Sequence, residues 1–98
     1  MPITTGFVAT THAERYIQQL VKHWNHKLAI AEADGLTTIP FSPQVTLILK
    51  AEPNGIIMRL SAPDEATDLR FRQVFENHLD RFAFREMPLV YSWSRQSA

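Results

Sequence analysis

The fold is decided by residues 45–60, which read VTLILKAEPNGIIMRL. Apolar residues alternate with other residues on both sides of a Pro-Asn-Gly turn signal, a pattern typical of the two strands of a β-hairpin. Because proline cannot adopt the positive φ of a two-residue primed turn, we predict a four-residue loop from Glu52 to Gly55, built around a type I turn. This loop places Leu47 opposite Leu60, so the apolar residues of the two strands share one face.

A second, shorter pairing precedes this hairpin, in residues 28–41. A two-residue turn at Asp34 and Gly35 places Ile30 opposite Ile39, so that apolar residues meet apolar residues. The competing interpretation extends the preceding helix through the alanine-rich start of this stretch, with Gly35 as its cap. We favour strands, because a continued helix would carry Ile30 onto a polar face.

Two amphipathic helices flank these strands. In the first, Thr11 and Glu14 match a capping box at the start, and the helical pattern ends near Lys27. The second follows residues 61–65, which combine a candidate cap, a proline and acidic residues. Their apolar stripes consist of Ala13, Ile17, Leu20, Val21, Trp24 and Leu28 in the first helix and of Phe71, Val74, Phe75, Leu79 and Phe82 in the second.

Short strands at both ends complete the pattern. Residues 7–9 precede the first helix, and residues 89–93 follow the second, before a loose tail. Four consecutive strands joined by short turns form an antiparallel meander, and the two helices must bury their stripes on one face of it. We therefore predict one domain over residues 1–98, an α+β two-layer sandwich with a curved, mainly antiparallel sheet and the order β-α-β-β-β-β-α-β. This order resembles the topology of TATA-binding-protein-like and helix-grip folds.

The composition narrows the classes of function. The 98 residues include ten Lys plus Arg, ten Asp plus Glu and no Cys, so the formal net charge is zero. A neutral chain lacks the attraction on which non-specific binding to nucleic acids and anionic membranes depends, and no apolar run approaches the roughly 20 residues of a membrane span. Without cysteine, disulfides and thiolate chemistry are excluded. We expect a cytoplasmic location, because no basic and apolar leader opens the sequence, and neither nucleic-acid nor membrane partners.

The candidate functional residues lie beside the two core stripes. His12, Tyr16, Gln19, His23 and His26 share about 80° of the first helix, on a face next to its apolar stripe. In the second helix, Arg81 and Arg85 lie four residues apart near the negative end, where two guanidinium groups could grip a carboxylate or phosphate. If these regions are neighbours, they form a pocket for a small anionic ligand. Its predicted lining is Tyr16, His23, His26, His78, Arg81 and Arg85.

Each of these residues also has a structural interpretation. Arginines near a helix C-terminus complement the helix dipole, and Asp80 or Glu86 could pair with them. Phe82 and Phe84 are expected in the core rather than in a stacking platform. The structural interpretation of the arginines carries more weight than the anion site on sequence grounds alone.

The histidines raise two further alternatives. His23 and His26 have the spacing of metal ligands, but two ligands do not make a zinc site, so we predict no metal centre and name no cofactor. His12 and Tyr16 could transfer a proton in a small acid–base enzyme. However, the sequence has no P-loop, dinucleotide-binding glycine motif, nucleophile elbow or zinc-protease motif, and it favours a binding module over an enzyme.

A third class of function uses the other face of the hairpin. There the predicted register places Lys50 opposite Ile57 and Ile48 opposite Arg59, so this face is mixed rather than fully polar. Together with Trp93, the two isoleucines could form the contact of a homodimer. The alternative is therefore a structural or interaction protein that uses its outer sheet face.

Two longer motifs resemble a known family. The first motif combines residues 11–16 (THAERY) with residues 22–27 (KHWNHK), and the second comprises residues 78–86 (HLDRFAFRE). With residues 39–41, they resemble a bacterial family known as domain of unknown function 2218. The resemblance implies a small bacterial accessory protein linked to siderophore or iron utilisation, with a siderophore-interacting reductase as its partner. It implies no catalytic or ligand-binding residues.

Overall fold

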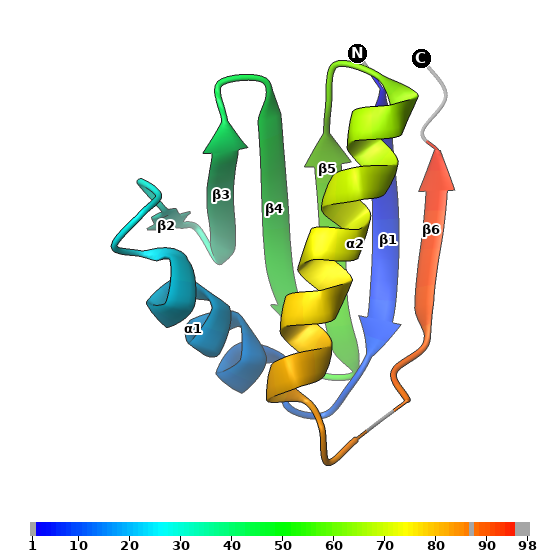
Figure 1. Ribbon diagram of the computed structural model, residues 1–98. Helices are drawn as coiled ribbons and strands as arrows, with labels where there is room; N and C mark the ends of the chain where they lie inside the picture. The colour runs from blue at the N-terminus through cyan, green and yellow to red at the C-terminus, as the bar shows by residue number, and fades with distance from the viewer. Residues whose placement is uncertain (1, 87, 96–98) are drawn as a thin grey trace.

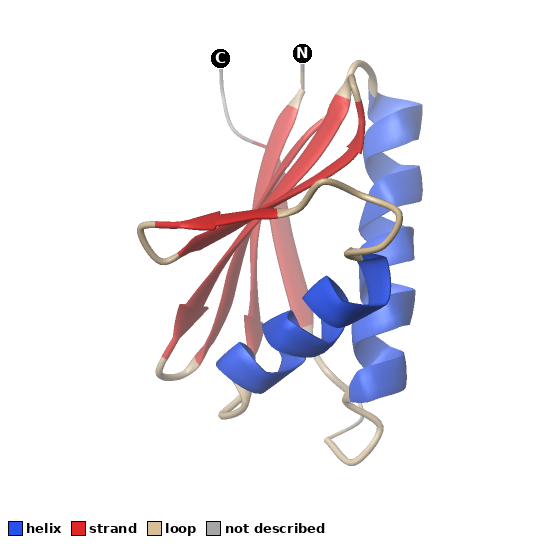
Figure 2. Cartoon of the chain, turned by 90° about the vertical axis from the view of Figure 1, so that its left-hand side faces the viewer, coloured by secondary structure: helices blue, strands red, loops and turns tan. Residues whose placement is uncertain are grey.

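Six strands form one antiparallel sheet, and both helices cover the same face of it (Figures 1 and 2). This computed structural model describes residues 2–86 and 88–95, so the predicted tail lies outside the described residues. In chain order the elements are β1 (Ile3–Ala9), α1 (Ala13–Trp24), β2 (Ala31–Ala33), β3 (Leu36–Ser42), β4 (Val45–Glu52), β5 (Gly55–Ser61), α2 (Glu65–Phe82) and β6 (Tyr91–Arg95). Across the sheet the strands run β2-β3-β4-β5-β1-β6. The α+β class, the two layers and the order of elements are as predicted.

The central hairpin has the predicted register. Leu47 lies opposite Leu60, and both side chains are buried under the helices. The ladder runs one pair further than predicted, because Glu52 and Gly55 also pair and only Pro53 and the residue after it form the turn. The proline is compatible with this turn because its φ is not positive.

The shorter hairpin also keeps its predicted register. Asp34 (φ 55°) and Gly35 (φ 77°) form the two-residue turn, and Ala31 lies opposite Thr38. These two positive φ values are those of a type I′ turn, the connection that best matches the twist of neighbouring strands. The first strand is shorter than predicted, because β2 begins only at Ala31.

The ends of α1 differ from the prediction. Thr11 does not cap the helix; instead the Thr10 hydroxyl accepts a hydrogen bond from the backbone N–H of His12 at 3.1 Å. Thr10 is buried and also contacts the segment after α2, so a tertiary contact selects it over the exposed Thr11. At the other end α1 stops at Trp24. There a hydrogen bond that spans three residues instead of four, from the Lys27 N–H to the Trp24 carbonyl at 2.9 Å, begins a turn.

The first strand lies in the middle of the sheet, between β5 and β6. It begins at Ile3 rather than at the predicted Phe7, since Thr4 and Gly6 occupy inward-facing positions where apolar side chains would have signalled a strand. Gly6 is required there. A Cβ atom at this position would lie 2.8 Å from the ring of Trp93, which covers the glycine from β6.

The hydrophobic core lies between the inner face of the sheet and the two helices. Phe75 and Leu79 of α2 are fully buried, whereas the rest of its predicted stripe is only partly buried. The main buried residues are Val8, Ile39, Val45, Leu47, Leu49, Ile56, Met58 and Leu60 from the strands and Ile17, Leu20, Trp24, Phe75 and Leu79 from the helices. Within the described residues, neither helix has the length and hydropathy needed to cross a membrane.

Trp93 lies on the inner face of the sheet, so the proposal that it contributes to an outer dimer contact is wrong. Its ring centroid is 6.1 Å from that of Phe75, and its indole N–H donates to the Glu76 carboxylate at 2.6 Å. The pairing of Trp93 with Gly6 in β1 determines this orientation. Sequence alternation in β6 alone does not specify which face its aromatic residues occupy.

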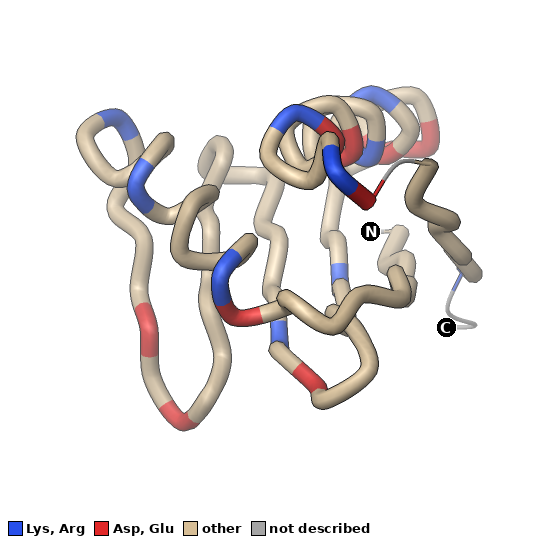
Figure 3. Tube along the Cα trace, turned by 90° about the horizontal axis from the view of Figure 1, so that it is seen from below, with Lys and Arg blue, Asp and Glu red and all other residues tan. Residues whose placement is uncertain are grey.

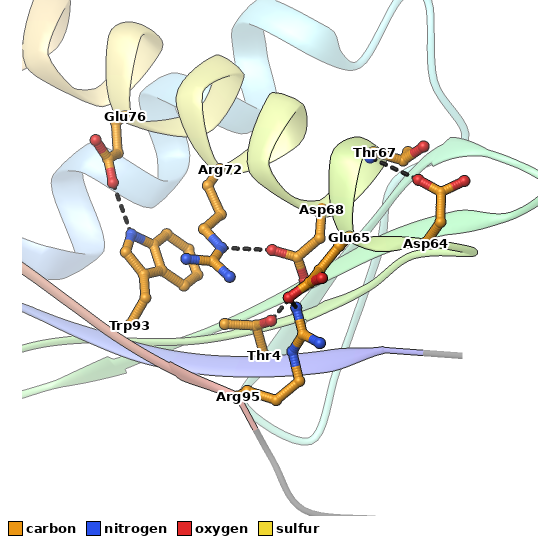
Figure 4. Close-up of polar contacts among 9 residues, drawn as sticks. All are labelled: Thr4, Asp64, Glu65, Thr67, Asp68, Arg72, Glu76, Trp93 and Arg95. Carbon is orange, nitrogen blue, oxygen red and sulfur yellow. Dashed lines mark hydrogen bonds and ion pairs between the residues drawn. The ribbon is translucent and has the colours of Figure 1, made fainter.

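A polar cluster ties the start of α2 to the sheet (Figure 4). Asp68 is 0% exposed and accepts hydrogen bonds from the Thr4 hydroxyl of β1, at 2.5 Å, and from the guanidinium of Arg72. The Arg72 guanidinium also lies 5.7 Å from the centre of the Trp93 ring. We call Thr4, Asp68 and Arg72 the Asp68 cluster. It satisfies a buried carboxylate entirely with groups of the chain.

Candidate functional site

The start of α1 and the end of α2 lie side by side (Figure 1) and enclose a pocket of about 300 Å³. We call it the helix-end pocket. Charged residues of both signs lie on the two helices and in the segment after α2, whereas the strands carry few (Figure 3). The pocket is lined by His12, Arg15, Tyr16 and Gln19 of α1 and its cap and by Phe82, Phe84, Arg85 and Glu86 of α2 and the following turn.

A clamp around Glu86 holds the two walls of the pocket together. The Tyr16 hydroxyl donates to the Glu86 carboxylate, and the Thr10 hydroxyl donates to the same oxygen at 2.8 Å. Burial, followed by the bond to Glu86 and its charge, raises the pKa of Tyr16 to about 12. The same two hydrogen bonds hold the pKa of Glu86 below its usual value. At neutral pH, Tyr16 is therefore a donor and Glu86 an ionised acceptor.

Two arginines face the pocket from opposite walls. Arg15 comes from the first turn of α1, and Arg85 from the turn that follows α2. Within the part of the chain that the structure describes, neither guanidinium lies at ion-pair distance from a carboxylate. Two cations thus accompany the single carboxylate of Glu86, and the pocket carries a net positive charge. Arg85 instead lies 5.5 Å from the centre of the Phe84 ring.

A shallower hollow adjoins the pocket. It is lined by Gln19, Lys22, His23, His26 and Phe82, and thus shares Gln19 and Phe82 with the helix-end pocket. The predicted polar stripe of α1 therefore lines both hollows beside the end of α2. This juxtaposition of the two helix regions is the arrangement on which the predicted anion site depends.

His23 and His78 lie against each other where the two helices meet. Their ring centroids are 5.0 Å apart, and His23 also packs on Trp24 and Phe82. Loss of hydration, followed by the proximity of His78 and Arg81, holds the pKa of His23 below its usual value. Nδ1 of His78 lies 2.7 Å from the Val74 carbonyl, which only accepts, so this nitrogen carries the proton.

The arrangement provides no ready-made metal centre. Among the residues that the structure describes, no three His, Cys, Asp or Glu side chains are grouped so as to hold a metal ion. The proton-transfer pair also does not form. His12 and Tyr16 contact each other edge to face with ring centroids 6.0 Å apart, but the Tyr16 hydroxyl is committed to Glu86.

The six predicted ligand residues occupy different places. Tyr16 and Arg85 line the helix-end pocket, and His23 and His26 line the adjoining hollow. His78 is packed between the helices, with its ring 4.8 Å from that of Trp24, and Arg81 is exposed on α2. Because α2 ends at Phe82, Arg81 and Arg85 do not sit on consecutive turns of one helix. The guanidinium group opposite Arg85 in the pocket belongs to Arg15.

Sequence reasoning missed Arg15 and misplaced three residues. Arg15 lies about 20° outside the arc of the polar stripe, so a slightly wider arc would have included it. Glu86 and Asp80 do not pair with the neighbouring arginines; Glu86 accepts from Tyr16, and Asp80 accepts from the Tyr91 hydroxyl at 2.6 Å. Phe84 is not in the core but is 66% exposed, because it follows the end of α2.

The outer face of the sheet is covered by neither helix (Figure 2). Ile57 is 39% exposed there, opposite Phe7 of the neighbouring strand, and Ile48 lies diagonally across from it. Lys50 and Arg59 border these residues. The face is therefore mixed, as predicted, with an apolar centre and two basic neighbours.

These features define the protein as a small two-layer α+β protein with a ligand-sized pocket where its two helices meet. Residues 5–94 match the family described as an uncharacterized protein conserved in bacteria, domain of unknown function 2218, and the chain belongs to this family. The predicted resemblance is thus confirmed. The chain is also similar to the NMR structure of PA4090 from Pseudomonas aeruginosa, with 32% identity over 96% of both chains and a TM-score of 0.79. No curated protein matches it.

Proposed function

We propose that this protein is a binding module that holds a small anionic molecule in the helix-end pocket. The observation that carries the proposal is the pair of guanidinium groups, Arg15 and Arg85, which face the same pocket without a carboxylate at ion-pair distance in the described part of the chain. Arginine binds carboxylates and phosphates through two parallel hydrogen bonds. An external anion would supply the partner that the chain does not.

The size of the pocket limits the ligand. A volume of about 300 Å³ lies at the lower end of the range of roughly 300–1,000 Å³ for small-molecule sites. This volume fits a molecule the size of an amino acid or a benzoic acid. A longer ligand would extend past Gln19 into the hollow of His23 and His26.

The family resemblance supplies a biological context for such an anion. If the protein acts in siderophore or iron utilisation, the ligand is an acidic siderophore or one of its building blocks, and a siderophore-interacting reductase is the partner. The pocket chemistry itself requires only an acid of suitable size. The proposal that the pocket binds an anion therefore does not depend on this context.

Titration calorimetry of the full chain with benzoate and with inorganic phosphate tests the anion site. We expect Arg15→Ala and Arg85→Ala each to weaken binding by about tenfold or more, because a charge-assisted hydrogen bond contributes about 1.5–3 kcal/mol. Arg59→Ala removes an exposed arginine from the opposite face and should leave the affinity unchanged. No binding of either anion at millimolar concentration, or an equal loss in all three variants, would refute the proposal.

The uncovered sheet face favours one second candidate, a homodimer. The exposed Ile57 and its neighbours Phe7 and Ile48 form the centre of the contact. Light scattering coupled to size-exclusion chromatography distinguishes the states. We expect a dimer that Ile57→Lys converts to a monomer, and a native chain that stays monomeric at high concentration would eliminate this candidate.

A further inference from the structure

Glu86 gives the helix-end pocket a negative group in addition to its two cations. The Tyr16 and Thr10 hydroxyls both donate to one oxygen of this carboxylate, Oε1. Within the described residues, no group donates to the second oxygen, Oε2, and the one side-chain atom that is both unpartnered and sealed from solvent belongs to Gln19. The Glu86 Oε2 atom is therefore accessible. Since a carboxylate accepts up to about four hydrogen bonds, Glu86 has capacity left for a donor on a ligand.

The charges of opposite sign in the pocket do not neutralise each other. Neither Arg15 nor Arg85 lies at ion-pair distance from a carboxylate of the described chain, that of Glu86 included. The hydrogen bonds from Tyr16 and Thr10 hold the pKa of Glu86 below its usual value, so this carboxylate is ionised at neutral pH. A ligand thus meets two cations and a separate anion in one pocket. A ligand with negative charge alone would pair with the arginines but be repelled by Glu86.

We infer that the ligand is an α-amino acid with an apolar side chain, an inference that rests on the anion-binding function proposed above. Its carboxylate pairs with the guanidinium groups of Arg15 and Arg85, and its ammonium group donates to Glu86. Its side chain packs against Phe82 and Phe84, which also line the pocket. Because Phe84 is 66% exposed, a ligand that covers its ring removes apolar surface from water.

The three contacts together agree with the size of the pocket and select against other classes of molecule. A single amino acid suits a volume of about 300 Å³. Simple amines lack the group that the two arginines bind, and their charge is repelled there. Simple carboxylic acids and phosphates leave Glu86 without a cation. Small polar amino acids leave the ring of Phe84 exposed to water.

Titration calorimetry of the full chain compares phenylalanine with three molecules that each lack one of its features. 3-Phenylpropionate lacks the ammonium group, 2-phenylethylamine lacks the carboxylate, and alanine lacks the ring. We expect phenylalanine to bind about tenfold more tightly than 3-phenylpropionate, because only the amino acid makes a charge-assisted hydrogen bond to Glu86. 2-Phenylethylamine and alanine should also bind more weakly than phenylalanine.

Glu86→Gln tests the contact with the ammonium group. Glutamine has nearly the same shape, and its amide oxygen can still accept from Tyr16 and Thr10. The preference for phenylalanine over 3-phenylpropionate should fall to about one, while 3-phenylpropionate itself binds at least as tightly as to the native chain, because the repulsion is removed. The matched control is Glu65→Gln, which removes the same charge at the other end of α2 and should keep the tenfold preference.

The outcomes separate this inference from the proposed function. If 3-phenylpropionate binds through Arg15 and Arg85 but phenylalanine binds no more tightly, the inference is wrong while the anion site stands. This comparison uses the native chain, so it decides the question even if Glu86→Gln fails to fold. A folded Glu86→Gln variant that keeps the preference would also refute the inference, and alanine equal to phenylalanine would refute its apolar part. If no acid binds, or if 2-phenylethylamine equals phenylalanine, both the inference and the proposed function are wrong.

Discussion

The two ends of α2 place charged groups in different surroundings. At its start, the buried carboxylate of Asp68 is matched by Thr4 and Arg72, so the Asp68 cluster is complete without any other molecule. At its end, Arg15 and Arg85 have no such partner within the described residues, although both face one pocket. Groups that the chain satisfies itself hold the fold together. Exposed cations that it leaves without an ion-pair partner at a pocket are available to a ligand.

The Asp68 cluster should carry the largest effect on stability. Asp68→Ala removes a fully buried carboxylate and leaves the Thr4 hydroxyl without its acceptor, so we expect a loss of about 3 kcal/mol in the free energy of unfolding. Denaturant unfolding measures it. The control is Glu65→Ala, which breaks an exposed ion pair with Arg95 and should change stability by less than about 0.5 kcal/mol. Equal effects of the two variants would contradict the distinction between the ends of α2.

The clamp around Glu86 should contribute less to the free energy of unfolding than the Asp68 cluster does. Tyr16→Phe removes one of the two hydroxyl donors to a carboxylate that solvent partly reaches, so we expect a loss of about 1 kcal/mol at neutral pH. The pKa of Tyr16 is raised from 10.0 to about 12, so its stabilising effect is complete below pH 10 and is lost as the pH rises toward 12. Unfolding curves of both proteins should therefore converge in this interval. A constant difference across it would show that the hydroxyl is not the stabilising group.

Acid should weaken the contact between His23 and His78. The resulting loss of stability should be smaller than that of Tyr16→Phe, because His23 is exposed and solvent screens its charge. The pKa of His23 lies below its unfolded value of 6.5, so the unfolded chain binds the proton more readily. Its stabilising effect is complete above this value and is lost as the pH falls below it. Thermal unfolding at about pH 7.5 and about pH 5.5 should show a smaller acid-induced decrease in melting temperature for His23→Gln than for the native protein. An identical decrease would exclude His23 as the source.

The arginines of the pocket should have the smallest effect on stability. Arg15→Ala and Arg85→Ala remove exposed side chains without an ion-pair partner in the described chain, so each should change the free energy of unfolding by less than about 0.5 kcal/mol. Denaturant unfolding of the double variant measures this directly. A loss comparable with that of Asp68→Ala would mean that both ends of α2 are structural.

Local periodicity was sufficient to predict much of the fold. The alternation in residues 45–60 determined the register of the central hairpin, and the Asp-Gly turn determined that of the shorter one. Non-local pairing determined the rest. The length of β1 depends on its pairing with β5 and β6, and the face on which Trp93 lies depends on its pairing with Gly6; no local pattern records either contact.

In the candidate site, too, the sequence predicted the local features but not those that depend on tertiary contacts. The polar stripe of α1 was visible in the sequence, because it depends only on the helical repeat. The Glu86 clamp was not, because Tyr16 and Glu86 are 70 residues apart and their contact depends on how two helices meet. The choice of Thr10 over Thr11 at the start of α1 has the same origin, since the Thr10 hydroxyl also bonds to Glu86.

The central position of β1 has a consequence for how the protein is made. A ribosome synthesises this strand before the other five, and its two neighbours, residues 55–61 and 91–95, follow much later. A nascent chain can assemble the meander early, yet β5 then presents an open edge to any other strand nearby until β1 docks. Correct assembly therefore requires that β1 pairs with the edge of β5 before a strand from another molecule pairs there.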